Sequence, residues 1–93
     1  MKYSFHPEAK EEFLKEIVMR EFKRITFSPE IMGGQACIRG MRIPVSLVVN
    51  LVANGLTADE IIKEYPDLEP DDIREALQYA SWLAKEVLHP AAI

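Results

Sequence analysis

The sequence predicts a mainly α-helical protein, in which a trihelical, helix-turn-helix-like unit is preceded by a short β-ribbon and an N-terminal amphipathic helix. Three observations predict this class. Apolar residues recur at spacings of three to five in the first and last parts of the chain, which is the spacing of one helix face. A capping-box sequence opens a short helix in the second half. In between, β-prone residues alternate with turn-forming glycines and prolines.

Residues 1–24 are predicted to form an extension in front of the main domain. Residues 2–5 have the composition of a short strand. Pro7 suits the first turn of a helix, and the glutamates after it favour the positive end of the helix dipole. We expect an amphipathic helix over 7–23. Its apolar face is formed by Ala9, Phe13, Leu14, Ile17, Val18 and Phe22.

The main domain, residues 25–93, is predicted to begin with a ribbon. Residues 25–27 are β-prone, residues 28–30 turn the chain, and the Gly33-Gly34 pair is a flexible break. The short runs 36–38 and 41–43 flank Arg39 and Gly40, a pattern typical of a small hairpin. Because an isolated two-stranded ribbon is marginally stable, we expect it to pack on helices or to pair across a dimer.

Three helices are expected after the ribbon, of roughly 11, 8 and 18 residues. Pro44 suits the start of the first, and Gly55 ends it. Residues 57–60 form the capping box of the second, since the Thr57 hydroxyl and the Glu60 carboxylate can each accept from a free backbone N–H. Pro66 breaks that helix.

The last helix is predicted to run from Pro70 to just before Pro90. Asp71 and Asp72 lie in its first turn, where they complement the helix dipole, and we expect both to stay solvated. Its apolar stripe is formed by Ile73, Ala76, Leu77, Ala80, Leu83, Ala84 and Val87.

Size and composition indicate one small soluble domain. The chain has 93 residues, of which 48% are hydrophobic and 28% charged, and a single cysteine, Cys37. We expect no disulfide, metal or cofactor, no membrane association, and a cytoplasmic location. Charge is unevenly placed: residues 1–42 hold eight Lys/Arg and six Asp/Glu, a net of +2, and residues 43–93 hold three and nine, a net of −6. Phosphate binding, if present, belongs to the first half.

A stretch from Ile25 to about Leu83 resembles the prokaryotic domain-of-unknown-function family 433. The matching residues are 29–34, 38–40, 42–45, 55–57, 64–68 and 73–77. Members of the family are regarded as helix-turn-helix, VapB-like antitoxins paired with PIN-like nuclease toxins. The resemblance therefore implies an antitoxin that forms a homodimer, sequesters a toxin protein and binds its own operator DNA.

A shorter resemblance lies at the front of the chain. Residues 5–13 are similar to the opening strand and helix of RelE/ParE-type toxins. The later basic and catalytic parts of those toxins have no counterpart here, so their activity does not carry over.

Basic residues of the first half are the candidates for nucleic-acid contact. Arg39 and Arg42 flank the predicted turn, where a ribbon projects them toward phosphates or toward an acidic partner. The alternative is that they are surface charges paired with Glu21 or Glu30. The last helix is acidic at its N-terminal end, which is unfavourable for gripping DNA. The candidate nucleic-acid-binding residues are Arg39, Arg42, Arg24, Lys23 and Arg74.

Apolar residues of the first and last helices are the candidates for protein contact. Tyr79 and Trp82 lie off the main stripe of the last helix, where aromatic side chains can anchor an interface. The alternative is that they extend the core and are covered by the N-terminal helix. The candidate partner-binding residues are Tyr79, Trp82, Phe13 and Ile17.

No nucleophile–base pair and no phosphate-cradling glycine loop stands out in the sequence, so we expect no enzyme and no small-molecule substrate. The leading hypothesis is an antitoxin-like binding protein that masks a PIN-like nuclease and autoregulates its transcription. The alternative is a protein-binding or dimerisation module with no affinity for DNA. A third, enzymatic hypothesis rests only on the toxin-like opening.

Overall fold

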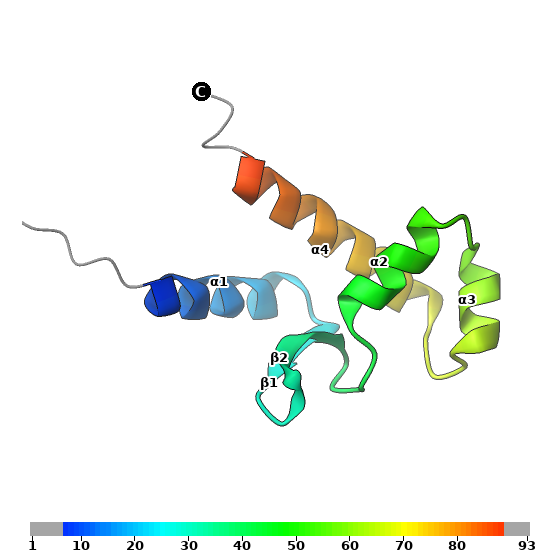
Figure 1. Cartoon of the computed structure of the whole chain (residues 1–93), viewed down its shortest axis with the longest axis horizontal. Helices are drawn as coiled ribbons and strands as arrows, with labels where there is room; N and C mark the ends of the chain where they lie inside the picture. Colours follow the sequence, from blue (N-terminus) through cyan, green and yellow to red (C-terminus); the bar gives the residue numbers. More distant parts are fainter. Residues whose placement is uncertain (1–6, 89–93) are drawn as a thin grey trace, which may run out of the picture.

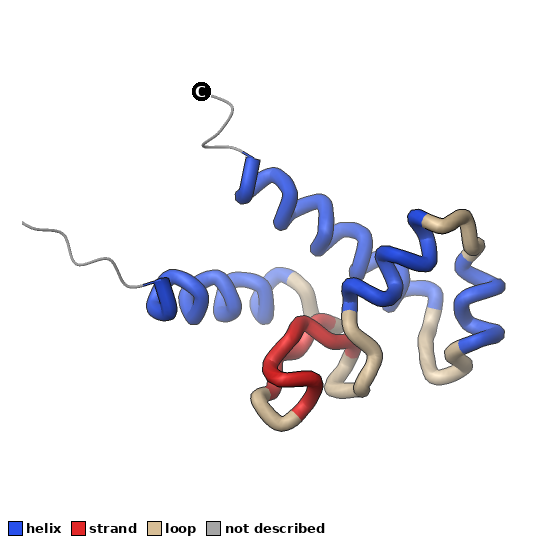
Figure 2. Tube along the Cα trace, in the orientation of Figure 1, coloured by secondary structure: helices blue, strands red, loops and turns tan. Residues whose placement is uncertain are grey.

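The computed structural model describes residues 7–88, which form a mixed α/β structure with four helices and a two-stranded antiparallel sheet. Helices α2, α3 and α4 pack together beside the sheet, whereas α1 and the C-terminal half of α4 extend away from this body (Figures 1 and 2). The elements, in chain order, are α1 (Pro7–Glu21), β1 (Ile25–Ser28), β2 (Ile31–Ile38), α2 (Val45–Ala53), α3 (Ala58–Glu64) and α4 (Pro70–Leu88).

Helix α1 buries only a narrow face. It ends two residues earlier than expected, and the Phe22 amide closes its last turn on the Val18 carbonyl at 2.7 Å. Val18 is buried, whereas Phe13 and Met19 are 61% and 51% exposed. The predicted strand at residues 2–5 lies outside the described residues.

The hairpin forms at a different turn from the predicted one. Strands β1 and β2 pair around Pro29 and Glu30, with Ile25 opposite Ile38 and a register shift after Phe27. The run 36–38 is extended as predicted, but its partner is β1. The run 41–43 forms no strand, and beyond it only a single bridge joins Cys37 to Pro44.

The Arg39-Gly40 turn itself exists. Both residues are left-handed, with φ of 44° and 71°, and the Met41 amide donates to the Ile38 carbonyl at 2.8 Å. Pro44 has no N–H with which to extend a ladder, whereas β1 offers β-branched and aromatic residues to β2. The pair Gly33 and Gly34, predicted as a break, lies within β2. Left-handed φ angles of 66° and 86° explain why glycine occupies both positions.

Helix α3 begins at the capping box predicted from the sequence. The Glu60 amide donates to the Thr57 hydroxyl at 3.2 Å, and the Thr57 amide donates to the Glu60 carboxylate at 2.8 Å. Two of the free N–H groups of the first turn are thereby satisfied. None of the helices in the described part of the chain has the length and apolar character needed to cross a bilayer.

The core lies where the sheet, α2, α3 and α4 meet. Its buried apolar side chains are Val18, Ile25, Ile38, Val45, Val48, Ile61, Leu68, Ile73 and Ala76. The predicted stripe of α4 is only partly buried: Leu77 and Leu83 are each 37% exposed, and Ala84 is also exposed. The core face of α4 is instead rotated to include Asp72.

Candidate functional site

Among the side chains of residues 12–85, the most buried charged group is Asp72, in the first turn of α4, with an exposed fraction of 0%. Its Oδ1 accepts from Arg24 Nη1 at 2.8 Å, and its Oδ2 accepts from Arg39 Nη2 at 2.8 Å. The Glu69 amide donates to the same Oδ2, also at 2.8 Å. The expectation that Asp72 stays solvated is therefore wrong. The two arginines flank the same end of the ribbon, where Ile25 pairs with Ile38 and the Arg39 amide donates to the Arg24 carbonyl at 2.8 Å. Asp72 therefore holds the open end of the ribbon against α4.

The charges around Asp72 stabilise its ionised form. Burial alone would raise the pKa of this carboxyl, but hydrogen bonds from Arg39, from the Glu69 amide and from Arg24 together lower it to about 2. The pKa of Arg39 is raised, chiefly by its hydrogen bond to Asp72. The pKa of Arg24 is raised by hydrogen bonds to Glu69 and then to Asp72. Both arginines are therefore firmly cationic.

Arg24 and Arg39 have further partners on the same side of the molecule. Arg24 Nη1 also donates to Glu69 at 2.7 Å, and its backbone amide donates to the Glu75 carboxylate. Arg39 Nη2 donates to the Asp67 carbonyl oxygen at 2.8 Å. The predicted pairing of Arg39 with Glu21 or Glu30 is therefore wrong, since its carboxylate partner is Asp72.

The other predicted basic residues lie apart from Asp72. Lys23 is exposed in the turn between α1 and β1, and Arg42 is exposed beyond the Arg39-Gly40 turn, with Nη2 at 3.5 Å from the Glu30 carbonyl oxygen. Arg74, on the outer face of α4, pairs with Asp71 at 2.6 Å, and both side chains are more than half exposed. The five predicted nucleic-acid contacts are thus divided: two are engaged with carboxylates of the fold, and three lie on the surface.

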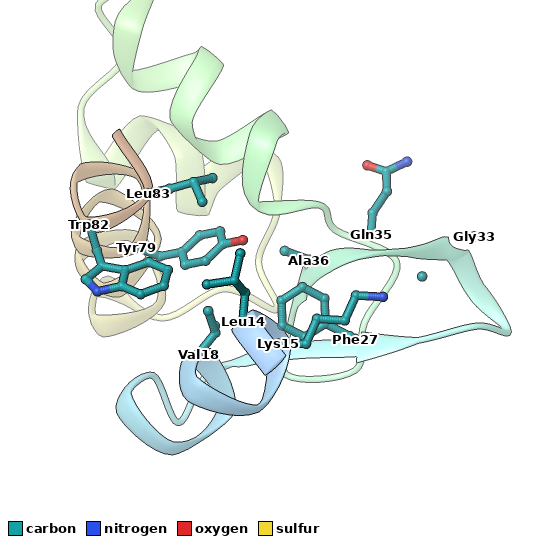
Figure 3. A pocket seen from close by; sticks show the side chains of 11 residues that line it. Leu14, Lys15, Val18, Phe27, Gly33, Gln35, Ala36, Tyr79, Trp82 and Leu83 are labelled. Carbon is teal, nitrogen blue, oxygen red and sulfur yellow. The ribbon is translucent and has the colours of Figure 1, made fainter. Parts of the chain in front are cut away.

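A groove of about 510 Å³ lies between α1, the two strands and α4, and we refer to it as the α1/α4 groove. Figure 3 shows side chains of α1, the ribbon and α4 turned toward this common space. Its apolar lining consists of Leu14, Val18, Phe27, Ala36, Tyr79, Trp82 and Leu83. Lys15 is the charged residue of the lining, with its ammonium 5.7 Å from the centre of the Phe27 ring.

Two aromatic rings of α4, those of Tyr79 and Trp82, line the α1/α4 groove and pack against a third ring, that of Phe22. Phe22, just after α1, packs edge-on against Tyr79 and Trp82, with ring centres 5.7 and 6.2 Å apart. Tyr79 and Trp82 stack at 6.4 Å. Burial raises the pKa of the Tyr79 hydroxyl. The two aromatics of α4 therefore contact the end of the N-terminal helix segment, and they also remain part of a surface groove.

A second groove of about 520 Å³ adjoins the first, between α2, β2 and α4, and is called here the α2/α4 groove. The two grooves share Gln35, Ala36, Tyr79 and Leu83. Of the other predicted partner-binding residues, Ile17 is half-buried on α1, and Phe13 is exposed. Neither Ile17 nor Phe13 lines a groove, and the two grooves meet at the apolar side chains of Ala36, Tyr79 and Leu83.

The burial of Asp72 and the positions of Phe27 and Phe22 beside α4 do not follow from the sequence. Asp72 has the position of an ordinary first-turn acid, and only its place directly before the core residue Ile73 hints at burial. The sequence assigns Phe27 to the ribbon and Phe22 to the apolar face of the first helix, without a link to Tyr79. Such contacts between distant segments leave no periodic signal in one chain.

The described side chains, residues 12–85, show little that resembles a catalytic or metal centre. No group of three or more His, Cys, Asp or Glu among them is placed to hold a metal ion. Cys37 is buried, and burial raises the pKa of its thiol, which disfavours the reactive thiolate. Every buried polar side-chain atom in this part of the chain has a hydrogen-bond partner. What this region can offer is apolar surface.

These features define a small mixed α/β protein with a groove between two helices. The family model described as "Protein of unknown function (DUF433)" matches residues 25–80, more than half of the chain, so the chain belongs to this family. The match begins at the first residue of β1 and leaves α1 outside.

Two relatives extend this comparison. The uncharacterized protein y4eO of Sinorhizobium fredii is 39% identical over 56 residues, which are 60% of this chain and 25% of that protein; the match thus spans about a quarter of this relative's length. The crystal structure of a DUF433 member from Anabaena variabilis superimposes with a TM-score of 0.62 at 28% identity, covering 97% of this chain and 88% of that one.

Proposed function

We propose that this protein is an antitoxin-like binding protein that sequesters a PIN-like nuclease toxin through its α1/α4 groove. The observation that carries the proposal is the set of apolar side chains that line this groove, and Phe13 and Met19 of the same helix α1 are also more than half exposed. Apolar and aromatic surface of this kind is what protein interfaces bury at their centres. The nuclease class comes from the sequence resemblance to VapB-like antitoxins.

Two finer parts of the proposal concern architecture and assembly. We assign α2, α3 and α4 to a trihelical, helix-turn-helix-like unit, which the short α2–α3 and α3–α4 connections and the capping box support. We further propose that the protein is a homodimer. Apolar side chains left exposed on α1 and α4 supply a surface that a second copy can cover.

Transcriptional autoregulation is the less supported part of the antitoxin assignment. Arg24 and Arg39 are held by carboxylates of the fold, which leaves Lys23 and Arg42 as the exposed cations of the basic half nearest the ribbon. This division favours the alternative function, a protein-binding or dimerisation module without DNA affinity. An enzymatic role inferred from the toxin-like opening has no support among the described residues.

The test is co-expression with a PIN-like nuclease from the same genome, sought first in the reading frames next to this gene. We expect the wild-type protein to relieve the growth arrest that the nuclease causes and to co-purify with it. Leu83→Ser, which places a hydroxyl in the groove, should weaken the complex at least tenfold. The matched control is Leu77→Ser, on the same helix and equally exposed but outside the lining of both grooves. Equal losses in both variants would contradict the groove assignment, and no complex with wild-type protein would contradict the function.

A further inference from the structure

The α1/α4 groove has two walls that come from opposite ends of the chain. One wall is formed by Leu14 and Val18 of α1, and the other by Tyr79, Trp82 and Leu83 of α4. Figure 1 shows the two helices diverging from the region of the ribbon, so a small change of angle there displaces their far ends strongly. The shape of the groove therefore depends on what fixes the point where α1 leaves the body.

That point is held by Arg24, two residues after Phe22. Its backbone amide is bonded to Glu75, and its guanidinium is bonded to Glu69 at 2.7 Å and to Asp72 at 2.8 Å. All three carboxylates belong to α4 or to the residue before it. A single residue in the α1–β1 connection, three positions after the end of α1, is thus tied to α4 through both its main chain and its side chain.

The guanidinium of Arg24 is not needed to satisfy Asp72. Without it, both carboxylate oxygens still accept from Arg39, at 3.0 Å from Nε and 2.8 Å from Nη2, and one also accepts from the Glu69 amide. Arg39 in turn donates to the Asp67 carbonyl oxygen, and its backbone amide donates to the Arg24 carbonyl at 2.8 Å, a bond that does not depend on the Arg24 side chain. Removing the Arg24 side chain therefore leaves the buried carboxylate paired, and it releases chiefly the tie between α1 and α4.

We infer that Arg24 is the positioning residue of the α1/α4 groove: by clamping the connection that follows α1 to Glu69 and Asp72, it fixes the angle between the two helices that form the walls. The inference deepens the proposed function and rests on it for its biological meaning. Its physical content, the angle between α1 and α4, concerns the protein without a partner.

The experiment measures the distance between the helices by double electron–electron resonance. Spin labels are attached at the exposed positions Glu16 of α1 and Ser81 of α4, in a Cys37→Ala background. We expect one narrow distance distribution for this parent protein. Arg24→Gln should at least double its width, and Arg24→Lys, which keeps the charge, should restore part of the narrowing. The emission of Trp82, the only tryptophan, should shift to longer wavelength in Arg24→Gln.

The control is Arg74→Gln, which removes an exposed ion pair on α4 without touching α1. An Arg24→Gln distribution as narrow as the parent's would overturn the inference. If circular dichroism shows that Arg24→Gln does not fold, Arg24→Lys decides: a broadened distribution supports the inference, and an unchanged one overturns it. Nuclease binding is measured separately. Failure of the wild-type protein to bind contradicts the proposed function alone, because the distance measurement involves no partner.

Discussion

At the scale of single residues, Asp72 decides how the ribbon joins the helices. A carboxylate with 0% exposure is costly to bury unless its charge and its lone pairs are matched. Here two guanidinium groups and one backbone amide supply the match. Removing the charge should therefore leave two cations facing a neutral group.

We predict that Asp72→Asn destabilises the protein by about 2 kcal/mol or more, because one buried member of a charge cluster loses its charge while its partners keep theirs. Urea denaturation followed by circular dichroism measures this loss. Asp71→Asn is the control on the same turn: its carboxylate is 55% exposed, so its loss should change stability by less than about 1 kcal/mol. Similar losses in both variants would contradict the special role of Asp72.

The same residue predicts a dependence of stability on pH. Its folded pKa of about 2 lies below the ordinary value of 3.8, so the folded state binds a proton less readily than the unfolded chain. This contribution is fully present above about pH 4 and is lost as the pH falls toward about 2, amounting to about 2 kcal/mol. Urea midpoints at several pH values in this window test the expectation. The Asp72→Asn variant should lack this part of the dependence, and parallel curves would argue against it.

At the scale of elements, the sequence predicted the helices better than the ribbon. The prolines before α2 and α4 and the capping box of α3 are local signals, and the structure places helix starts at or directly after them. The hairpin prediction failed because two nearby runs, 25–28 and 41–43, could each pair with residues 36–38, and local spacing does not decide between them. Arg39 and Gly40 do form a turn, but β2 pairs with β1, whose Ile25 lies 13 positions from its partner Ile38.

The candidate site was predictable to a similar extent. Tyr79 and Trp82 stand out by their position off the main stripe of the last helix, and they do line the α1/α4 groove. Their contact with Phe22 depends on where α1 ends and on the clamp at Arg24, and neither follows from local spacing. The burial of Asp72 escapes prediction for the same reason.

The capping box gives a prediction at this scale. Thr57→Ala should destabilise the protein by about 1 kcal/mol, because the Glu60 amide loses its side-chain acceptor at the start of a short helix. Thr57→Ser keeps the hydroxyl and should stay within about 0.5 kcal/mol of the wild type. Thermal unfolding of the three proteins makes the comparison, and equal stability of the alanine and wild-type proteins would show that the cap is dispensable.

At the scale of the whole molecule, the uneven charge of the chain is partly used inside the fold. The first 42 residues carry a net charge of +2, and the remainder carries −6. Arg24 and Arg39 come from the basic part, and Glu69 and Asp72 from the acidic part, so the clamp joins the two halves. In the sequence alone, this asymmetry points to external partners. The structure shows that part of it is internal complementarity, which reduces the positive charge available to a nucleic acid.

The small amount of positive charge left on the surface sets how the protein is expected to bind DNA. If the proposed homodimer binds its upstream region, Lys23 and Arg42 of each copy supply the contacts. Four phosphate contacts predict an affinity that falls by about 100-fold between about 50 and about 200 mM salt. A mobility-shift titration at both concentrations measures the fall, and Arg42→Ala should weaken binding and flatten the salt dependence. Arg74→Ala should change neither the affinity nor its salt dependence, because Arg74 is paired with Asp71.

A different result would contradict the repressor role. If the protein shifts no DNA even at the lower salt concentration but still binds the nuclease, it is a protein-binding module only. Because Arg24 and Arg39 are already bonded within the fold, protein binding without DNA binding is the physically simpler of the two outcomes.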